Sequence, residues 1–190
     1  MQPHMSTAEH ALLTSLLRSS RNYLEFGSGG STYRACQLVG ESVTSIDSSQ
    51  AWLNDVALAC EGPDCPIKPT LAHVDIGPIG DWGMPTDMST KDRWPSYYQD
   101  IWEKPSVSDT DLYLVDGRFR VACFMQTLLN CRSDALIMIH DFSGRAHYHI
   151  VREVAREVAQ AEELSVFMPR PGQSHARIRD ILSQYRFERN

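Results

Sequence analysis

Short apolar runs alternate with amphipathic stretches along almost the whole chain, and this alternation restricts the fold more than any other feature. The apolar runs lie at residues 22–26, 42–46, 70–74, 112–115, 135–139 and 164–168. Runs that are apolar throughout are typical of strands that helices cover on both faces. Because strands and helices alternate, we predict a doubly wound, mostly parallel sheet in a three-layer α/β/α fold.

The segments between these runs carry helical signals. Ser6 and Glu9 have the spacing of a capping box, and leucines at helical intervals follow them. We therefore expect a first helix at residues 7–18. Further helices are expected at residues 31–39, 49–60, 119–131, 147–162 and 176–185.

Length and composition exclude several classes of protein. A chain of 190 residues with 42% apolar residues can build one core but not two, so we treat residues 1–190 as a single domain. The net charge of −6, without a basic cluster, argues against a nucleic-acid partner. No apolar run approaches the roughly 20 residues of a membrane helix, and no signal peptide is evident. Five cysteines are too few for a disulfide framework, so we expect reduced thiols and a cytoplasmic protein.

Four successive apolar runs, from the second to the fifth, are followed by an aspartate. These residues are Asp47, Asp75, Asp116 and Asp141. Parallel strands end on the same edge of a sheet, and ligands bind outside that edge. Four carboxylates there would repel one another unless they bind a polar or cationic ligand. We interpret this edge as a functional rim, although single acids at strand ends are also ordinary turn residues.

A glycine cluster follows the first apolar run and directly precedes a predicted helix. Gly27, Gly29 and Gly30 allow the backbone to turn sharply and to approach a ligand closely. Asp47 lies twenty residues after Gly27, where an acid accepts hydrogen bonds from ribose hydroxyls in dinucleotide-binding proteins. The dinucleotide fingerprint G-x-G-x-x-G is incomplete, however, because Thr32 stands at its third glycine position.

The segment Tyr23-Leu24-Glu25-Phe26-Gly27-Ser28-Gly29-Gly30-Ser31 resembles motif I (E-x-G-x-G-x) of the class I S-adenosylmethionine (SAM)-dependent methyltransferases. The resemblance continues, in the same order, at residues 45–47, 111–117 and 137–141. It implies a Rossmann-like class I methyltransferase fold that binds SAM and transfers its methyl group to a small-molecule acceptor. Residues 74–78 and 115–120 are also similar to those of small bacterial methyltransferase-like proteins.

The resemblance assigns cofactor-binding roles to residues of the rim. Glu25 would orient the glycine loop and approach the methionine ammonium group. Asp47 would accept hydrogen bonds from the ribose hydroxyls. Asp75 and Ile76 would lie near the adenine, which Trp52 could also reach. The loop that would bind the cofactor consists of Gly27, Ser28, Gly29 and Gly30.

Methyl transfer from a sulfonium is an in-line displacement, so the protein must align the nucleophile and, where needed, remove a proton. We select Asp116, His140 and Asp141 as catalytic candidates because they follow neighbouring predicted strands. Asp116 would also contact the cofactor beside the reacting methyl group. Asp116 and Asp141 could hold Mg²⁺ instead. We favour a site without metal, because Phe142 follows Asp141 where an Asn or Asp would suit a metal.

Three features leave alternatives open. Arg118 and Arg120 could pair with an anionic acceptor or with the acids of the rim, and we favour the acids. The segment 76–110 would form a lid over the acceptor or cover an edge of the core. The C-terminal hairpin strand usual in the family is not evident after residue 169.

The favoured function is thus a SAM-dependent methyltransferase with a small-molecule acceptor that the sequence does not identify. One alternative is a non-catalytic module that binds SAM or a nucleoside and signals to a partner. A second is a nicotinamide-dependent oxidoreductase, which the incomplete fingerprint disfavours. A third is a metal-assisted hydrolase or a hydroxylase-like enzyme.

Overall fold

The sheet of the computed structural model, which describes residues 1–189, has seven strands in the order β3-β2-β1-β4-β5-β7-β6. Strands β1 to β5 pair in parallel, and β7 pairs antiparallel with both β5 and β6. This arrangement confirms the predicted doubly wound, mostly parallel sheet. The strands are β1 (Asn22–Phe26), β2 (Ser42–Asp47), β3 (Thr70–His73), β4 (Leu112–Val115), β5 (Leu136–Ile139), β6 (Ala155–Ala161) and β7 (Leu164–Pro169).

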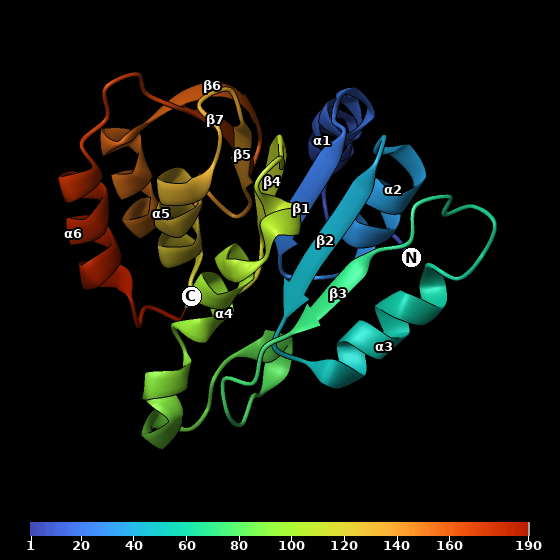
Figure 1. The fold of residues 1–190 in the computed structure, drawn as a ribbon, viewed down its shortest axis with the longest axis horizontal. Helices are drawn as coiled ribbons and strands as arrows, with labels where there is room; N and C mark the ends of the chain where they lie inside the picture. The colour runs from blue at the N-terminus through green and yellow to red at the C-terminus, as the bar shows by residue number, and fades with distance from the viewer. Residues whose placement is uncertain (190) are drawn as a thin grey trace.

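Two helical layers flank this sheet (Figure 1). Tyr23 of β1 packs in the core under the first layer, and its neighbour Leu24 packs in the core under the second. This alternation explains why the strands are apolar on both faces. The first layer contains α1 (Thr7–Ser19), α2 (Gly30–Leu38) and α3 (Gln50–Ala59), and the second contains α4 (Ser96–Gln99), α5 (Arg120–Asn130) and α6 (His175–Tyr185).

The start of α1 has the predicted capping box. The Ser6 hydroxyl accepts a hydrogen bond from the Glu9 amide, and the Glu9 carboxylate accepts one from the Ser6 amide at 2.7 Å. These contacts satisfy two amides that a helix start leaves without partners. Every helix of the described residues is too short or too polar to cross a bilayer.

The helix predicted at residues 147–162 is wrong. A 3₁₀ helix, η5 (Ala146–Glu153), occupies the first half, and strand β6 occupies the second. Val151 and Val154 are buried, but Val158, which continued their helical spacing, is exposed. Strands β6 and β7 form an antiparallel hairpin, so the C-terminal hairpin usual in the family is present, and it ends at Pro169 rather than following it.

The segment between β3 and β4 is made of short turns. Besides α4 it contains the 3₁₀ helices η1 (Asp81–Gly83), η2 (Met88–Arg93), η3 (Asp100–Glu103) and η4 (Pro105–Val107). In Figure 1 this green segment lies at the end of the sheet toward which the arrows of β2 and β3 point. Trp94, Tyr97 and Tyr98 are buried in the core under the second helical layer, whereas Trp82 is 84% exposed. Three of its aromatic residues therefore belong to the core, and its role as a lid stays a prediction.

Candidate functional site

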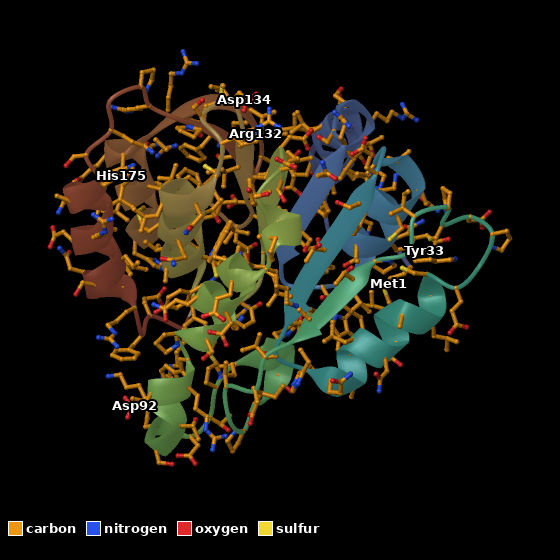
Figure 2. All side chains as sticks on the ribbon, in the orientation of Figure 1. Met1, Tyr33, Asp92, Arg132, Asp134 and His175 are labelled. Atoms are coloured by element: carbon orange, nitrogen blue, oxygen red, sulfur yellow. The ribbon has the colours of Figure 1, made fainter. Side chains whose placement is uncertain are left out.

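The predicted rim forms at the carboxyl edge of the parallel strands. Pairing of β1 with β4 and of β4 with β5 places Gly27, Asp116 and His140 beside one another, each directly after its strand. In Figure 2, Arg132 and Asp134 mark the opposite edge, where β5 is about to begin. The site therefore lies where ligands of open parallel sheets bind.

The glycine loop after β1 packs tightly against Gly117 and stays partly exposed at Gly27 and Ser28. Gly27 has a φ of +98°, and a Cβ atom there would lie 2.5 Å from the Gly117 backbone nitrogen. Only glycine fits at that position. A Cβ atom at Gly29, in contrast, would meet only the Trp52 indole, in ordinary contact at 3.7 Å. Gly29 itself is buried, so the partly exposed Ser28 is the part of the loop beside Asp47 that a ligand can approach.

Glu25 of β1 supports this loop through hydrogen bonds. Its fully buried carboxylate accepts hydrogen bonds from Tyr23 at 2.8 Å, from Ser31 at 2.6 Å and from Thr32. Burial raises the pKa of Glu25 to about 7, although these hydrogen bonds act in the opposite direction. The Thr32 hydroxyl also accepts a hydrogen bond from the Gly29 amide at 2.8 Å, which explains a threonine at the third glycine position. The expected approach of Glu25 to a ligand ammonium group stays a prediction.

Asp47 is held in place by backbone amides at the end of β2. One carboxylate oxygen accepts from the Ser28 amide at 3.0 Å, and the other accepts from the Ser49 amide at 2.9 Å. Burial raises the pKa of Asp47, and the amides partly offset this rise. The Trp52 indole, 41% exposed, donates to the Ser28 carbonyl at 2.7 Å. An oriented carboxylate and an aromatic ring thus lie on either side of Ser28.

The residues predicted to lie near adenine have different environments. Asp75 is exposed, accepts from the Gly77 amide at 2.9 Å and pairs with Arg93 at 3.0 Å. It lines an open depression of about 390 Å³ between the end of β3 and α4. Ile76 is fully buried in the core and does not line this depression. Both adenine assignments stay predictions.

The three predicted catalytic residues come together. His140 Nδ1 lies 3.1 Å from an Asp116 oxygen and 3.7 Å from an Asp141 oxygen. Burial lowers the pKa of His140, but the hydrogen bond and charge of Asp116, with Asp141 and Glu9, outweigh it and raise that pKa. Burial likewise raises the pKa of Asp116, but His140 and Arg120 outweigh it, so that pKa is lowered. The cluster therefore favours an ionised aspartate beside a charged imidazole.

Arg120 at the start of α5 joins the two aspartates. Its buried guanidinium lies 3.2 Å from an Asp116 oxygen and 2.8 Å from an Asp141 oxygen. It also donates to the backbone carbonyls of Asp116, Gly117 and His140. The prediction that arginines pair with the acids of the rim is therefore confirmed for Arg120. The sequence showed no sign that this one residue would bridge both acids.

The donor set does not fit Mg²⁺. Asp116, His140 and Asp141 offer ligand atoms within 4.8 Å of one another, which is the size of a metal site. Mg²⁺ needs near-octahedral oxygen ligands. Here the guanidinium of Arg120 already lies between the two carboxylates, and one of the three donors is a nitrogen. We derive no step through a metal.

Sequence reasoning missed two residues that reach the rim from other elements. Glu9 of α1 is buried, accepts from the Glu163 amide at 2.9 Å and lies 3.6 Å from His140 Nε2. The hydroxyl of Tyr97 of α4 would lie 2.2 Å from a Cβ atom at Gly117. The capping box was the only signal at Glu9, and the aromatic composition of residues 76–110 was the only signal at Tyr97.

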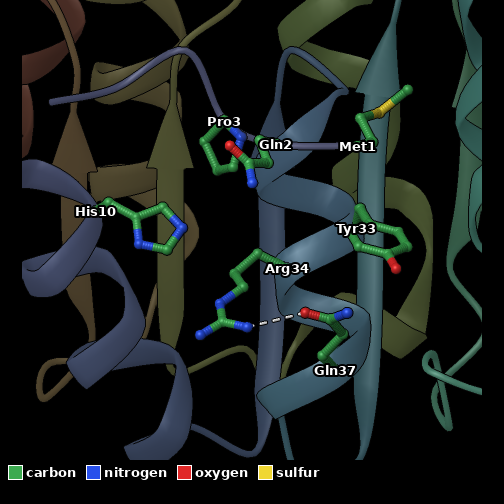
Figure 3. Close-up of a pocket in the computed structure, with 7 residues that line it drawn as sticks. All are labelled: Met1, Gln2, Pro3, His10, Tyr33, Arg34 and Gln37. Carbon is green, nitrogen blue, oxygen red and sulfur yellow. Dashed lines mark hydrogen bonds between the residues drawn. The ribbon is translucent and has the colours of Figure 1, made fainter. Parts of the chain in front are cut away.

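A second depression, of about 380 Å³, lies between α1 and α2 under residues 1–3 (Figure 3). Arg34 donates to Gln37 at 3.0 Å on its floor. None of the predicted site residues lines it. We therefore place the functional site at the rim.

Comparison with known proteins identifies the family. No protein-family model and no curated protein matches the chain. Among solved structures, a methyltransferase-like protein from Silicibacter pomeroyi is 30% identical, with a TM-score of 0.87. The match covers 98% of this chain and 97% of that protein. The chain belongs to the class I methyltransferase family.

More distant class I methyltransferases share the fold. The O-methyltransferase TomG from Streptomyces achromogenes, solved in complex with SAM, is 14% identical over 88% of this chain and 82% of its own, with a TM-score of 0.56. An RNA methyltransferase from Salinibacter ruber, solved with S-adenosyl-L-homocysteine, is 11% identical over 90% of this chain and 95% of its own, with a TM-score of 0.58. At this identity they support the architecture and not a substrate.

Proposed function

We propose that this protein is a SAM-dependent methyltransferase that acts on a small-molecule acceptor. The observation that carries the proposal is the partly exposed Asp47 carboxylate, fixed by two amides beside the partly exposed Ser28. A fixed carboxylate at this position suits the two hydroxyls of a ribose. Family membership, and the SAM complexes of fold neighbours, support the same cofactor.

The residues present fit the cofactor on the side of Ser28 and Asp47, which are both partly exposed. Asp47 and the loop backbone would hold its ribose and methionine portions, and Trp52 would cover the loop. When bound, SAM supplies an electrophilic methyl group on a sulfonium. The net charge of −6 favours a small acceptor over a nucleic acid.

The acids of the rim would orient the acceptor. The side chains of Asp116 and Asp141 are 28% and 34% exposed, so an acceptor can reach their oxygens. His140 is almost fully buried, and its two nitrogens face Asp116 and Glu9. We therefore assign His140 as a positioning residue for Asp116. Asp116, with its lowered pKa, is suited to orienting a nucleophile by hydrogen bonding rather than to acting as a strong base.

Isothermal titration with SAM tests the proposal. We expect binding by the wild-type protein and at least tenfold weaker binding by Asp47→Ala, because a hydrogen bond to a charged group contributes about 1.5–3 kcal/mol. Asp55→Ala is the matched control, since Asp55 is an exposed residue of α3. Absence of wild-type binding at millimolar SAM would contradict the proposal. Bound SAM that is never demethylated across a broad panel of acceptors would favour the non-catalytic module.

A further inference from the structure

Arg118 has an environment unlike that of the other arginines around it. It is half-buried, two residues after Asp116, and its Nε atom is buried without a hydrogen-bond partner. Its guanidinium forms no hydrogen bond or ion pair within the part of the chain that the structure describes. Burial lowers the pKa of Arg118, and the neighbouring Arg120 lowers it further. A buried donor without a partner is unfavourable, so a native structure that retains one calls for an explanation.

The nearby carboxylates are already paired with other groups. Asp116 binds His140 and Arg120, and Asp141 binds Arg120 and Arg145. Arg120 and Arg145 therefore already occupy these two carboxylates.

Asp47 is close enough to Arg118 to interact electrostatically, but two backbone amides hold its oxygens. Asp116 also interacts electrostatically with Arg118, so within the described residues Arg118 lies near two acids without an ion pair to either.

The surroundings of Arg118 suit an anion. Arg145 adds to the lowering of the pKa of Arg118, as a second positive charge in its surroundings. Arg145 donates to the Tyr148 hydroxyl at 3.2 Å and pairs with Asp141 at 2.9 Å, so it is held by its own partners. A guanidinium is planar and presents parallel donors that match the two oxygens of a carboxylate or phosphate.

We propose that Arg118 forms an anion subsite of the rim that binds a carboxylate or phosphate group. Such a group is present on an anionic acceptor and also on SAM itself, whose methionine portion carries a carboxylate. Assignment of the subsite to either source rests on the proposed function, whereas the subsite itself does not. The prediction that both arginines pair with acids is accordingly replaced for Arg118.

Titration with inorganic phosphate, followed by NMR of the arginine Nε–Hε signals, tests the subsite without SAM. We expect phosphate to shift the Arg118 signal and to bind Arg118→Gln at least tenfold more weakly than wild type. Arg179→Gln makes the same charge change at an exposed residue of α6 and should leave the affinity unchanged. Equal phosphate affinity in wild type and Arg118→Gln would overturn the proposal.

Arg118→Lys distinguishes loss of the subsite from a folding defect, because it keeps the positive charge but lacks the planar guanidinium with its parallel donors. We expect this variant to melt like wild type and to bind phosphate with intermediate affinity. Wild-type affinity in Arg118→Lys would show that a bulk charge, rather than a built subsite, attracts the anion.

Two further titrations distinguish the sources of the anion. If Arg118 binds the cofactor, Arg118→Gln weakens SAM at least tenfold and leaves decarboxylated SAM unaffected. If Arg118 binds the acceptor, the variant binds both compounds like wild type, and phosphate still binds the SAM-saturated protein. Wild-type protein that binds phosphate but not SAM would contradict the proposed function and leave the subsite standing.

Discussion

At the scale of single residues, Arg120 changes the electrostatics of the rim, because its side chain pairs with both Asp116 and Asp141. Two carboxylates at neighbouring strand ends are expected to repel each other or to share a cation. In this protein a buried guanidinium takes that place, so the charge of Asp116 and Asp141 is compensated from inside the fold. The acids are thereby held in fixed orientations, as their proposed role in orienting an acceptor requires, and the neighbouring Arg118 is left for the proposed anion subsite.

The burial of Glu25 makes the stability of the fold depend on pH. Its pKa rises from the usual 4.5 to about 7 on burial, so the folded state binds this proton more tightly than the unfolded state. The resulting stabilisation is complete below pH 4.5 and is lost as the pH rises through about 7.

We therefore expect the free energy of unfolding of wild type, relative to Glu25→Gln, to fall by roughly 2 to 3 kcal/mol between pH 4.5 and pH 8. Urea unfolding of both proteins measures this difference. His140 is present in both proteins, so its contribution to the pH dependence cancels from this difference. A difference that does not change with pH would show that Glu25 is ionised in the folded state at both values.

At the scale of elements, the sequence predicted which residues follow the strands, but it did not predict the ion pairs that link neighbouring strand ends. Asp47, Asp116 and Asp141 could be placed on one edge because parallel strands end together. The bridge by Arg120 depends on the distance between two strands, which no local pattern encodes. Residues 147–162 were misassigned because the helical spacing of Val151, Val154 and Val158 runs across two elements. The first two belong to η5 and its end, and Val158 lies in β6, which pairs with β7.

The start of α2 depends on the N-terminal segment. A Cβ atom at Gly30 would lie 2.0 Å from the carbonyl carbon of Gln2, and Figure 3 shows residues 1–3 passing over this helix. We expect Gly30→Ala to displace them and to lower the free energy of unfolding by about 1–3 kcal/mol. In a protein that lacks residues 1–4, the same change should be neutral or stabilising, since alanine favours helices.

Urea unfolding of the four proteins measures both effects. Gly62→Ala is a suitable control, because nothing lies within 4 Å of a Cβ atom there. An equal cost of Gly30→Ala with and without residues 1–4 would exclude a clash with that segment.

At the scale of the whole molecule, two cores share one sheet. Cys36 of α2 lies in the core on one face, and Cys123 of α5 lies in the core on the other. Both thiols are fully buried, and burial raises the pKa of each. Because the thiolate is the reactive form, neither should be modified while its layer is folded.

If residues 1–190 unfold as one domain, the two thiols should become reactive together. Each helical layer loses its packing surface when the common sheet opens, so neither layer can persist alone. We expect thiol labelling in increasing urea, with mass spectrometry of the two peptides, to give the same midpoint for Cys36 and Cys123. A midpoint for Cys36 well below that for Cys123 would mean that the layer beside the glycine loop opens independently, and cofactor binding would then be coupled to that local opening.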